Sequence, residues 1–134
     1  MNDLLATLRA VNAASAFDRW LGVELVAAGE GQAELRLALR ADLLNQAGGL
    51  HAALIAGLID RACGFAAASV AGGVMTSHFS TDCYKPPVGD AVICRGRVTR
   101  AGKRQVFATA ELFALQDDVE TLVAGGSAVL LRAT

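Results

Sequence analysis

The chain has 134 residues, and its length, composition and charge already exclude several classes of protein. This length suits a single domain over residues 1–134 and leaves little room for a second. With 54% hydrophobic residues and a formal net charge of −1, the chain lacks the low hydropathy of disordered proteins and the basic surplus of nucleic-acid binders. Because only 19% of the residues are charged, little polar surface is available to cover so apolar a chain, and we expect a second subunit to cover part of it.

The N-terminal residues and the cysteines indicate a cytoplasmic protein without a membrane span. Asp3 stands where a secretory signal would carry Lys or Arg, and no long apolar run follows it. The longest apolar stretch, residues 50–70, carries His51 and the adjacent pair Asp60 and Arg61, which would be costly in hydrocarbon. Three cysteines have neither metal nor redox spacing, and we interpret them as buried thiols of a reducing compartment: Cys63, Cys83 and Cys94.

The first third of the chain is predicted to be helical and then extended. Residues 1–20 form an N-terminal helical segment: apolar spacing over residues 2–14 predicts one helix, and residues 17–21 predict a further short turn that ends at Gly22. Two strand-like segments and a loop follow, at residues 23–27, 33–40 and 41–49. In the second segment apolar residues alternate with charged ones, which is typical of a half-buried antiparallel strand.

Residues 50–70 are the one long helical candidate, and they are apolar nearly all round the helix. Such a helix is buried, and Gly72 and Gly73 are expected to end it. Four strand-like segments follow, at residues 74–84, 90–100, 104–115 and 121–132. This order predicts an α+β domain in which one curved antiparallel sheet wraps a single helix, while the uncovered side of the helix meets a second subunit.

Asp60 is the first candidate for chemistry, because a carboxylate in an otherwise apolar helix requires a partner or a cleft. His51 precedes it by nine residues, which at about 100° and 1.5 Å per residue places the two on opposite faces and about 13–14 Å apart. They cannot serve one site within one subunit. Two copies of the helix packed antiparallel about a two-fold axis would bring His51 of one copy to face Asp60 of the other, twice per dimer.

The start of the same helix offers a second element of a site. Unpaired backbone N–H groups around His51 and Ala52, at the positive end of the helix dipole, stabilise negative charge on a carbonyl oxygen. A carboxylate opposite them would attack the carbonyl or deprotonate a water. Strict alternation over residues 74–84 puts Ser77 on the same strand face as the apolar Phe79, where it would hold that water. The sequence has no Gly-x-Ser-x-Gly elbow, phosphate-cradling loop, dinucleotide fingerprint or clustered metal ligands. It therefore predicts acyl transfer to water without a metal.

Each of these residues also has a purely structural interpretation. Asn45 would make an Asx-turn in its loop, and His51 would only begin the helix. Asp60 would pair with its neighbour Arg61 on a solvated face.

Residues 45–51 (Asn-Gln-Ala-Gly-Gly-Leu-His), followed by Asp60, resemble the Asn-x-x-Gly-x-x-His…Asp signature of hotdog-fold acyl-CoA thioesterases. The most similar group is the phenylacetate-pathway type within the 4-hydroxybenzoyl-CoA thioesterase superfamily. Further resemblances to this family lie in the strand and turn over residues 76–90, in the hairpin Val-x-Arg-x-Gly-Lys at residues 98–103, and at residues 122–124. Together these motifs span about residues 20 to 132.

The resemblance implies a hotdog fold, a homodimer, and often a homotetramer of two dimers. Asp60 would be the general base or nucleophile that cleaves an acyl-CoA thioester. Asn45 and His51 of the other subunit would orient the thioester or the water, the backbone N–H of Ala52 would polarise the carbonyl, and Ser77 would assist the water. Gly48, from the same signature, is assigned to substrate binding. No cofactor is implied beyond the coenzyme A of the substrate.

The chain departs from the family pattern after His51, where Ala52 and Ala53 replace the usual Gly-Gly. A backbone donor survives this change, but the two methyl groups narrow the passage for the acyl or pantetheine group. Four cations at turns are candidates for the phosphates of coenzyme A, although ordinary solvated turn residues would look the same: Lys85, Arg100, Lys103 and Arg104.

Two other functions are compatible with a hotdog fold. One is a non-catalytic acyl-CoA-binding dimer with a vestigial site. The other is a dehydratase or hydratase, which needs a His and an acid over the α and β carbons of the acyl group. No matching motif surrounds His51 or His78, so we rank this function last.

Overall fold

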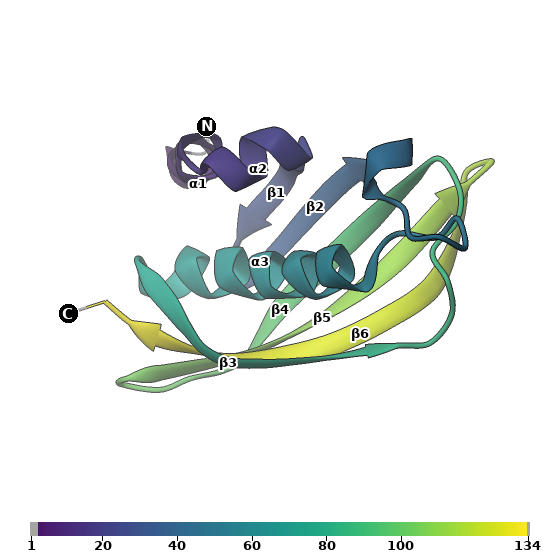
Figure 1. Cartoon of the computed structure of the whole chain (residues 1–134). Coiled ribbons are helices and arrows are strands. Elements are labelled where there is room, and N and C mark those ends of the chain that lie inside the picture. Colours follow the sequence, from purple (N-terminus) through teal and green to yellow (C-terminus); the bar gives the residue numbers. More distant parts are fainter. Residues whose placement is uncertain (1–2, 134) are drawn as a thin grey trace.

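A six-stranded antiparallel sheet curves around one long helix in the computed structural model, which describes residues 3–133 (Figure 1). The strand order is β1-β2-β4-β5-β6-β3, so β1 and β3 are the two edges. The strands are β1 (Glu24–Gly29), β2 (Gln32–Ala38), β3 (Val74–Cys83), β4 (Ala91–Ala101), β5 (Gln105–Gln116) and β6 (Val119–Arg132). All neighbouring pairs are antiparallel, which confirms the predicted α+β architecture.

The central helix, α3 (Ala52–Ala71), contacts every strand of the sheet. Its length and apolar composition would suffice for a membrane span, but the sheet wraps it as a core helix (Figure 1). The sheet backbone approaches it closely: a Cβ on Gly96 of β4 would lie 2.5 Å from the carbonyl oxygen of Ala62. The helix begins two residues later than the predicted range of 50–70, because His51 is its N-cap.

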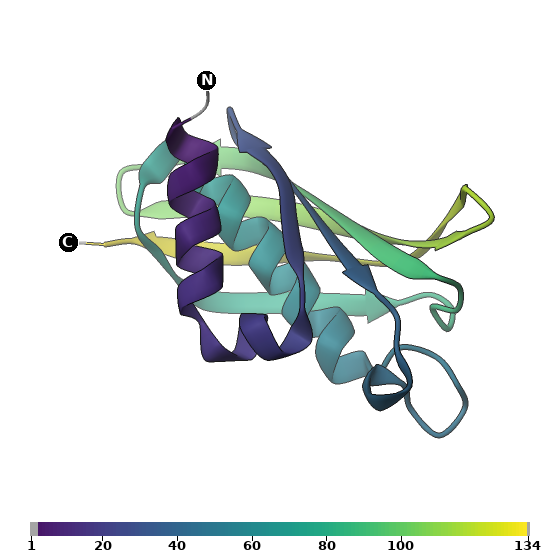
Figure 2. The ribbon, with the colours of Figure 1, turned by 90° about the horizontal axis from the view of Figure 1, so that it is seen from above.

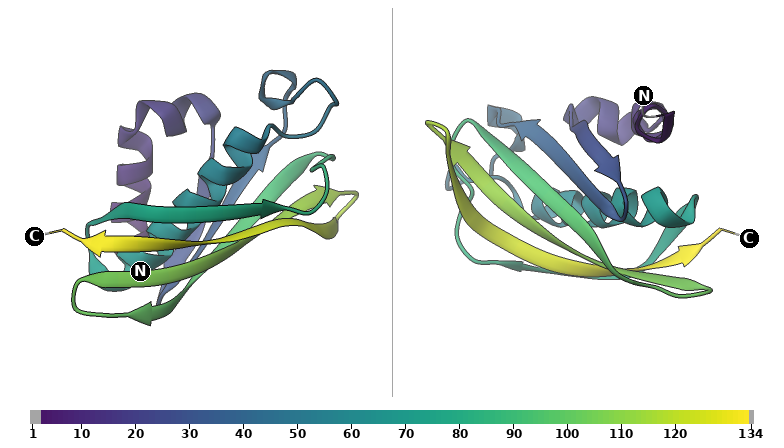
Figure 3. Two further views of the ribbon diagram at one scale, coloured as in Figure 1. Left: turned by 60° about the horizontal axis from the view of Figure 1, so that its bottom comes forward. Right: turned by 180° about the vertical axis from the view of Figure 1, so that it is seen from behind.

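Two shorter helices precede the sheet: α1 (Asp3–Ala14) lies beside the C-terminal half of α3, and α2 (Ala16–Leu21) lies beside its middle (Figure 2). Residue 2 of the predicted first helix lies outside the described residues. Ser15 caps α2 by accepting a hydrogen bond from the N–H of Asp18 at 3.3 Å. Gly22 ends α2 at φ 80°, a left-handed conformation that favours glycine. All three α-helices lie on one side of the sheet (Figure 3).

A β-bulge in β3 changes which side chains face the helix. Thr76 pairs with Leu130 and His78 pairs with Val129, so Ser77 is the extra residue. The half-buried positions consequently change from Val74 and Thr76 before the bulge to Thr81 after it. The strict alternation predicted for this strand is therefore wrong, and Thr76 rather than Ser77 reaches α3.

Of the three cysteines, only Cys63 and Cys94 are buried as predicted. Burial, together with the nearby charge of Asp60, raises the pKa of Cys63 to about 12, and burial also raises the pKa of Cys94. Both thiols therefore stay protonated and are poor nucleophiles. Cys83 is exposed, contrary to the prediction, because it is the last residue of an edge strand.

Candidate functional site

Asp60 projects from the middle of α3, and its carboxylate is held by the edge strand. Thr76 Oγ1 donates a hydrogen bond of 2.6 Å to Asp60 Oδ1. The other carboxylate oxygen makes no hydrogen bond within residues 3–133. Sequence reasoning missed Thr76, because the bulge that turns it toward the helix depends on pairing with β6.

Arg61, the neighbour of Asp60, is directed elsewhere. Its guanidinium lies 2.7 Å from the carboxylate of Asp18 and 4.6 Å from the ring centroid of Phe65. Asp18 is only 3% exposed, so its carboxylate needs this cationic partner, and the ion pair links α2 to α3. The predicted structural pair of Asp60 and Arg61 is wrong, and no cation in the described part of the chain forms an ion pair with Asp60.

A cavity of about 300 Å³ opens beside Asp60 and Thr76, between α1, α3 and the start of β3. Most of its wall is apolar, and it includes Leu8, Phe65 and Leu130. A carboxylate with no cationic partner therefore faces an apolar space large enough for a small organic group.

The start of α3 is shaped by two side chains of the signature. Asn45 Oδ1 accepts hydrogen bonds from the N–H groups of Ala47 and Gly49, at 2.9 and 3.2 Å, which closes the predicted Asx-type turn. Gly48 in that turn has φ 87°, so a side chain there would be strained. His51 Nδ1 accepts from the N–H of Ala53 at 3.0 Å, which leaves Nε2 as the nitrogen that carries the proton.

The N–H of Ala52 has no acceptor among the hydrogen bonds of residues 3–133, because Ala52 is the first residue of α3. It borders a second cavity, of about 310 Å³, together with Asn45, Tyr84 and Lys85. A helix N-terminus with a free amide favours negative charge on a ligand.

Within one chain, the predicted site residues therefore form three separate groups. Asn45, Gly48, His51, Ala52 and Lys85 gather at the start of α3. Asp60 and Ser77 lie about half-way along it, and the nine residues from His51 to Asp60 correspond to about 13–14 Å of helix. Ser77 is exposed, and its hydroxyl donates to the carbonyl oxygen of Val129 at 3.3 Å.

The third group is the cations of the β4–β5 hairpin, Arg100, Lys103 and Arg104, all of them exposed. This hairpin lies at the opposite end of the sheet from the β3–β4 connection that carries Lys85 (Figure 1). A single chain therefore does not bring the four predicted phosphate-binding cations together.

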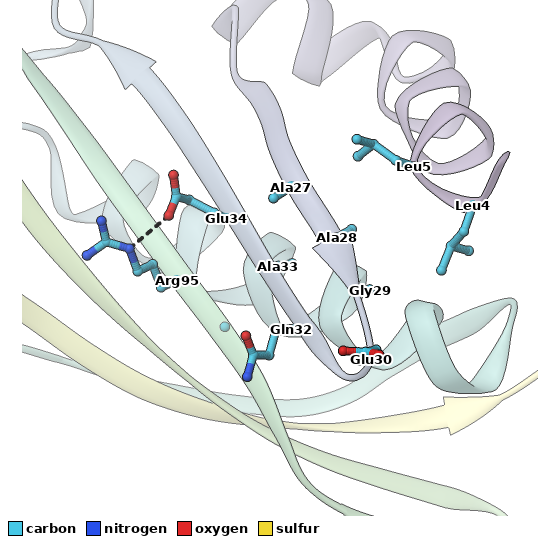
Figure 4. A pocket seen from close by; sticks show the side chains of 11 residues that line it. Leu4, Leu5, Ala27, Ala28, Gly29, Glu30, Gln32, Ala33, Glu34 and Arg95 are labelled. Carbon is cyan, nitrogen blue, oxygen red and sulfur yellow. Dashed lines mark hydrogen bonds and ion pairs between the residues drawn. The ribbon is translucent and has the colours of Figure 1, made fainter. Parts of the chain in front are cut away.

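A further cavity, of about 590 Å³, lies away from all of these groups. It is bounded by α1 on one side and by β1 and β2 on the other, and the ion pair of Glu34 with Arg95, 2.9 Å long, stands at its rim (Figure 4). Arg95 also binds both carboxylate oxygens of Glu120 at 2.8 Å, which lowers the pKa of Glu120. The two acids that line this cavity are Glu34, which is paired with Arg95, and Glu30 in the β1–β2 turn.

Comparison with known proteins agrees with the fold and the signature. The family model of the thioesterase superfamily matches residues 47–121, more than half of the chain. A thioesterase family protein from Silicibacter pomeroyi has a TM-score of 0.91 at 28% identity, with 96% of each chain covered. A conserved protein from Pseudomonas aeruginosa has a TM-score of 0.82 at 29% identity, covering 92% of this chain and 98% of that one.

The PaaI protein from the phenylacetic acid degradation operon of E. coli shares the fold, with a TM-score of 0.87 at 21% identity over 98% of this chain and 94% of that one. No curated protein matches the chain. The sheet wrapped around α3, the signature that begins at Asn45 and the family match agree: this chain has the hotdog fold and belongs to the thioesterase superfamily.

Proposed function

We propose that this protein hydrolyses an acyl-CoA thioester to the free acid and coenzyme A in the cytoplasm, with no metal or organic cofactor. The observation that carries the proposal is the state of Asp60. Its carboxylate has no cationic partner within residues 3–133, one oxygen is fixed by Thr76, and it borders an apolar cavity. In a member of the thioesterase superfamily, such a group is suited to act on a carbonyl carbon or on the water that attacks it.

The hydrogen bond from Thr76 assigns different roles to the two carboxylate oxygens. Oδ1 accepts from Thr76, so Oδ2 acts on the substrate. As a general base, Oδ2 takes a proton from water while the water oxygen bonds to the thioester carbon. As a nucleophile, it bonds to that carbon, and water then cleaves the resulting anhydride. In both routes the tetrahedral oxyanion collapses and expels the thiolate of coenzyme A, and Ser77 helps to hold the water.

The oxyanion needs hydrogen-bond donors, and in this proposal a second copy of the chain supplies them. The amide of Ala52 is free and lies at a helix N-terminus, but it is about as far from Asp60 along α3 as His51 is. Two α3 helices packed antiparallel would place Ala52, His51 and Asn45 of one subunit opposite Asp60 of the other, giving two equivalent sites.

The surface of β3 supports the homodimer. As an edge strand it presents backbone groups with no partner strand, and it also exposes Met75 (68%) and Phe79 (40%). Pairing with the β3 strand of a second subunit would give these backbone groups hydrogen-bond partners and would cover the two exposed apolar side chains. Two such dimers would make the homotetramer that is frequent in the family.

The antiparallel dimer also gives the separated cations a common role. Lys85 lies near the start of α3, whereas the β4–β5 hairpin lies toward the end of α3 (Figure 1). Antiparallel helices would bring Lys85 of one subunit to the same side as Arg100, Lys103 and Arg104 of the other. In the proposal these cations attract the phosphates of coenzyme A.

The test is release of free thiol from a panel of acyl-CoA substrates by the purified protein. Asp60→Asn keeps the shape of the side chain but removes its basicity, so we expect kcat to fall by a factor of about 10²–10⁴. Asp117→Asn is the control, because Asp117 lies in the exposed β5–β6 turn at φ 51°, a conformation that Asn also tolerates.

Full activity of Asp60→Asn would refute the mechanism. Saturable binding of acyl-CoA without turnover, across chain lengths, would instead favour the non-catalytic binding protein. Single-turnover hydrolysis in labelled water separates the two routes, since only the nucleophilic one leaves labelled oxygen in Asp60.

A further inference from the structure

The cavity beside Asp60 has one wall made by α1. Leu4, Thr7, Leu8 and Val11 line it, and their spacing of three and four residues puts them on one face of that helix. Leu8 is buried, whereas Val11 is 50% exposed at the edge of the cavity. This helix lies outside residues 47–121, so the family match alone says nothing about this wall.

The opposite wall is open because Gly64 has no side chain. Gly64 lies four residues after Asp60, one turn along α3 on the same face, and both line the cavity. Apart from neighbouring residues and the backbone of α3, the one atom within residues 3–133 that a Cβ at Gly64 would meet within 4 Å is Leu130 Cδ2, 3.8 Å away. That distance is an ordinary van der Waals contact, so the fold does not require glycine here. What glycine provides is space next to the carboxylate.

The chemistry at Asp60 limits what this space can hold. The carbonyl carbon carries two substituents, the acyl group and the sulfur of coenzyme A. The coenzyme arm is long, polar and charged, and it must reach solvent, so an apolar cavity of about 300 Å³ does not suit it. Among residues 3–133, Arg61 is the one cation on the wall, and it is already paired with Asp18, so it offers no free charge for an anionic acyl group.

We propose that this cavity binds the acyl group as an uncharged hydrocarbon, and that Gly64 and Val11 set the size of the acyl group that is accepted. This inference rests on the thioester hydrolysis proposed above. The acyl group enters between α1 and α3, with its carbonyl at Asp60 and its far end against the wall formed by α1.

The test compares kcat/KM for acetyl-, hexanoyl- and decanoyl-CoA in variants that narrow or widen the cavity. Gly64→Leu fills the space near Asp60, and we expect it to lower the ratio of hexanoyl- to acetyl-CoA hydrolysis by about tenfold or more. Val11→Ala removes two methyl carbons from the far edge, and we expect it to raise the ratio of decanoyl- to hexanoyl-CoA hydrolysis by about fourfold.

Val119→Ala is the matched control, since Val119 is also exposed (63%) but lies at the start of β6, outside the lining of the cavity. It should leave both ratios unchanged. If Gly64→Leu does not fold, Gly64→Ala and Val11→Ala carry the test, because each changes the cavity by only one or two carbons.

Unchanged ratios in folded Gly64 and Val11 variants, with an active wild type, would overturn the acyl cavity and leave the hydrolysis proposal standing. If the wild type hydrolyses none of the substrates, calorimetry with uncleavable S-(2-oxoalkyl) analogues of the acetyl and hexanoyl thioesters separates the two proposals. If Gly64→Leu weakens binding of the hexanoyl analogue but not of the acetyl analogue, the cavity binds the acyl group even though the protein does not hydrolyse the thioester. Equal weakening of both analogues, or no binding of either, would overturn it.

Discussion

The start of α3 and its middle use their polar side chains in opposite ways. At the start, Asn45 and His51 are engaged in local structure through their acceptor atoms, and what remains available is a set of donors that includes the free N–H of Ala52. In the middle, Asp60 has one oxygen held by Thr76 and the other available as an acceptor or base. In the proposed mechanism each region therefore supplies half of what thioester hydrolysis needs, and the two halves lie too far apart to combine within one chain.

After Asp60→Asn, the largest expected effect comes from removing the donor at the start of α3. Proline at the first residue of a helix removes the N–H but preserves the helix, and His51 already has a backbone (φ −61°, ψ 139°) that a following proline allows. We expect Ala52→Pro to lower kcat by a factor of about 10²–10³, the cost of losing one oxyanion donor. Steady-state kinetics on the best acyl-CoA substrate measures it.

Ala16→Pro is the control for that substitution. Ala16 is the first residue of α2 and follows the capping residue Ser15, so the same change is made at the same kind of position outside the site. Loss of activity in both variants would point to a general effect of proline. Normal kinetics in a folded Ala52→Pro would remove Ala52 from the mechanism.

Mixing subunits tests whether the two halves come from different chains. Homodimers of Asp60→Asn and of Ala52→Pro are each inactive in this view. Random reassociation makes about half of the dimers mixed, and each mixed dimer has one site with both changes and one intact site. We expect activity to return to about a quarter of the wild-type value. A mixture as inactive as its components would show that each site lies within one chain.

Asp60 and Arg61 offer a closer comparison, because adjacent residues are assigned to function and to structure. Arg61→Met would leave Asp18, only 3% exposed, without its cation, and we expect unfolding free energy to fall by about 3 kcal/mol. Asp60→Asn should change stability by less than about 1 kcal/mol, since the amide still accepts from Thr76. Urea unfolding of both variants measures the difference, and equal losses would contradict the division of roles.

A smaller effect on kcat is expected at Thr76, which in the proposed mechanism acts on the substrate only through Asp60. Thr76→Val keeps the shape but removes the hydrogen bond to Oδ1, and we expect kcat to fall about tenfold with KM little changed. Thr76→Ser keeps the hydroxyl and should restore most of the rate. A rise in KM with unchanged kcat, or no recovery with serine, would mean that Thr76 only lines the cavity.

Sequence reasoning predicted most of the fold because the relevant signals are local. The apolar spacing of residues 50–70 and the alternation of residues 33–40 are properties of neighbouring residues, and both correspond to elements, α3 and β2. Element ends moved by one or two residues where a cap or turn decided them. For example, Asp117 and Asp118 adopt φ 51° and 64°, which makes a tight hairpin and lets β6 begin at Val119.

The candidate site was harder to predict, because its key contacts join residues far apart in the chain. The sequence alone identified Asp60 as a carboxylate in an apolar helix and showed that His51 lies too far along that helix to share its site. Only the tertiary structure decided the partners. Pairing of β3 with β6 creates the bulge that turns Thr76 toward Asp60. Packing of α2 against α3 brings Asp18 within ion-pair distance of Arg61. Hydrophobic periodicity reports which face of an element is buried, but not which side chain of a distant element meets it there.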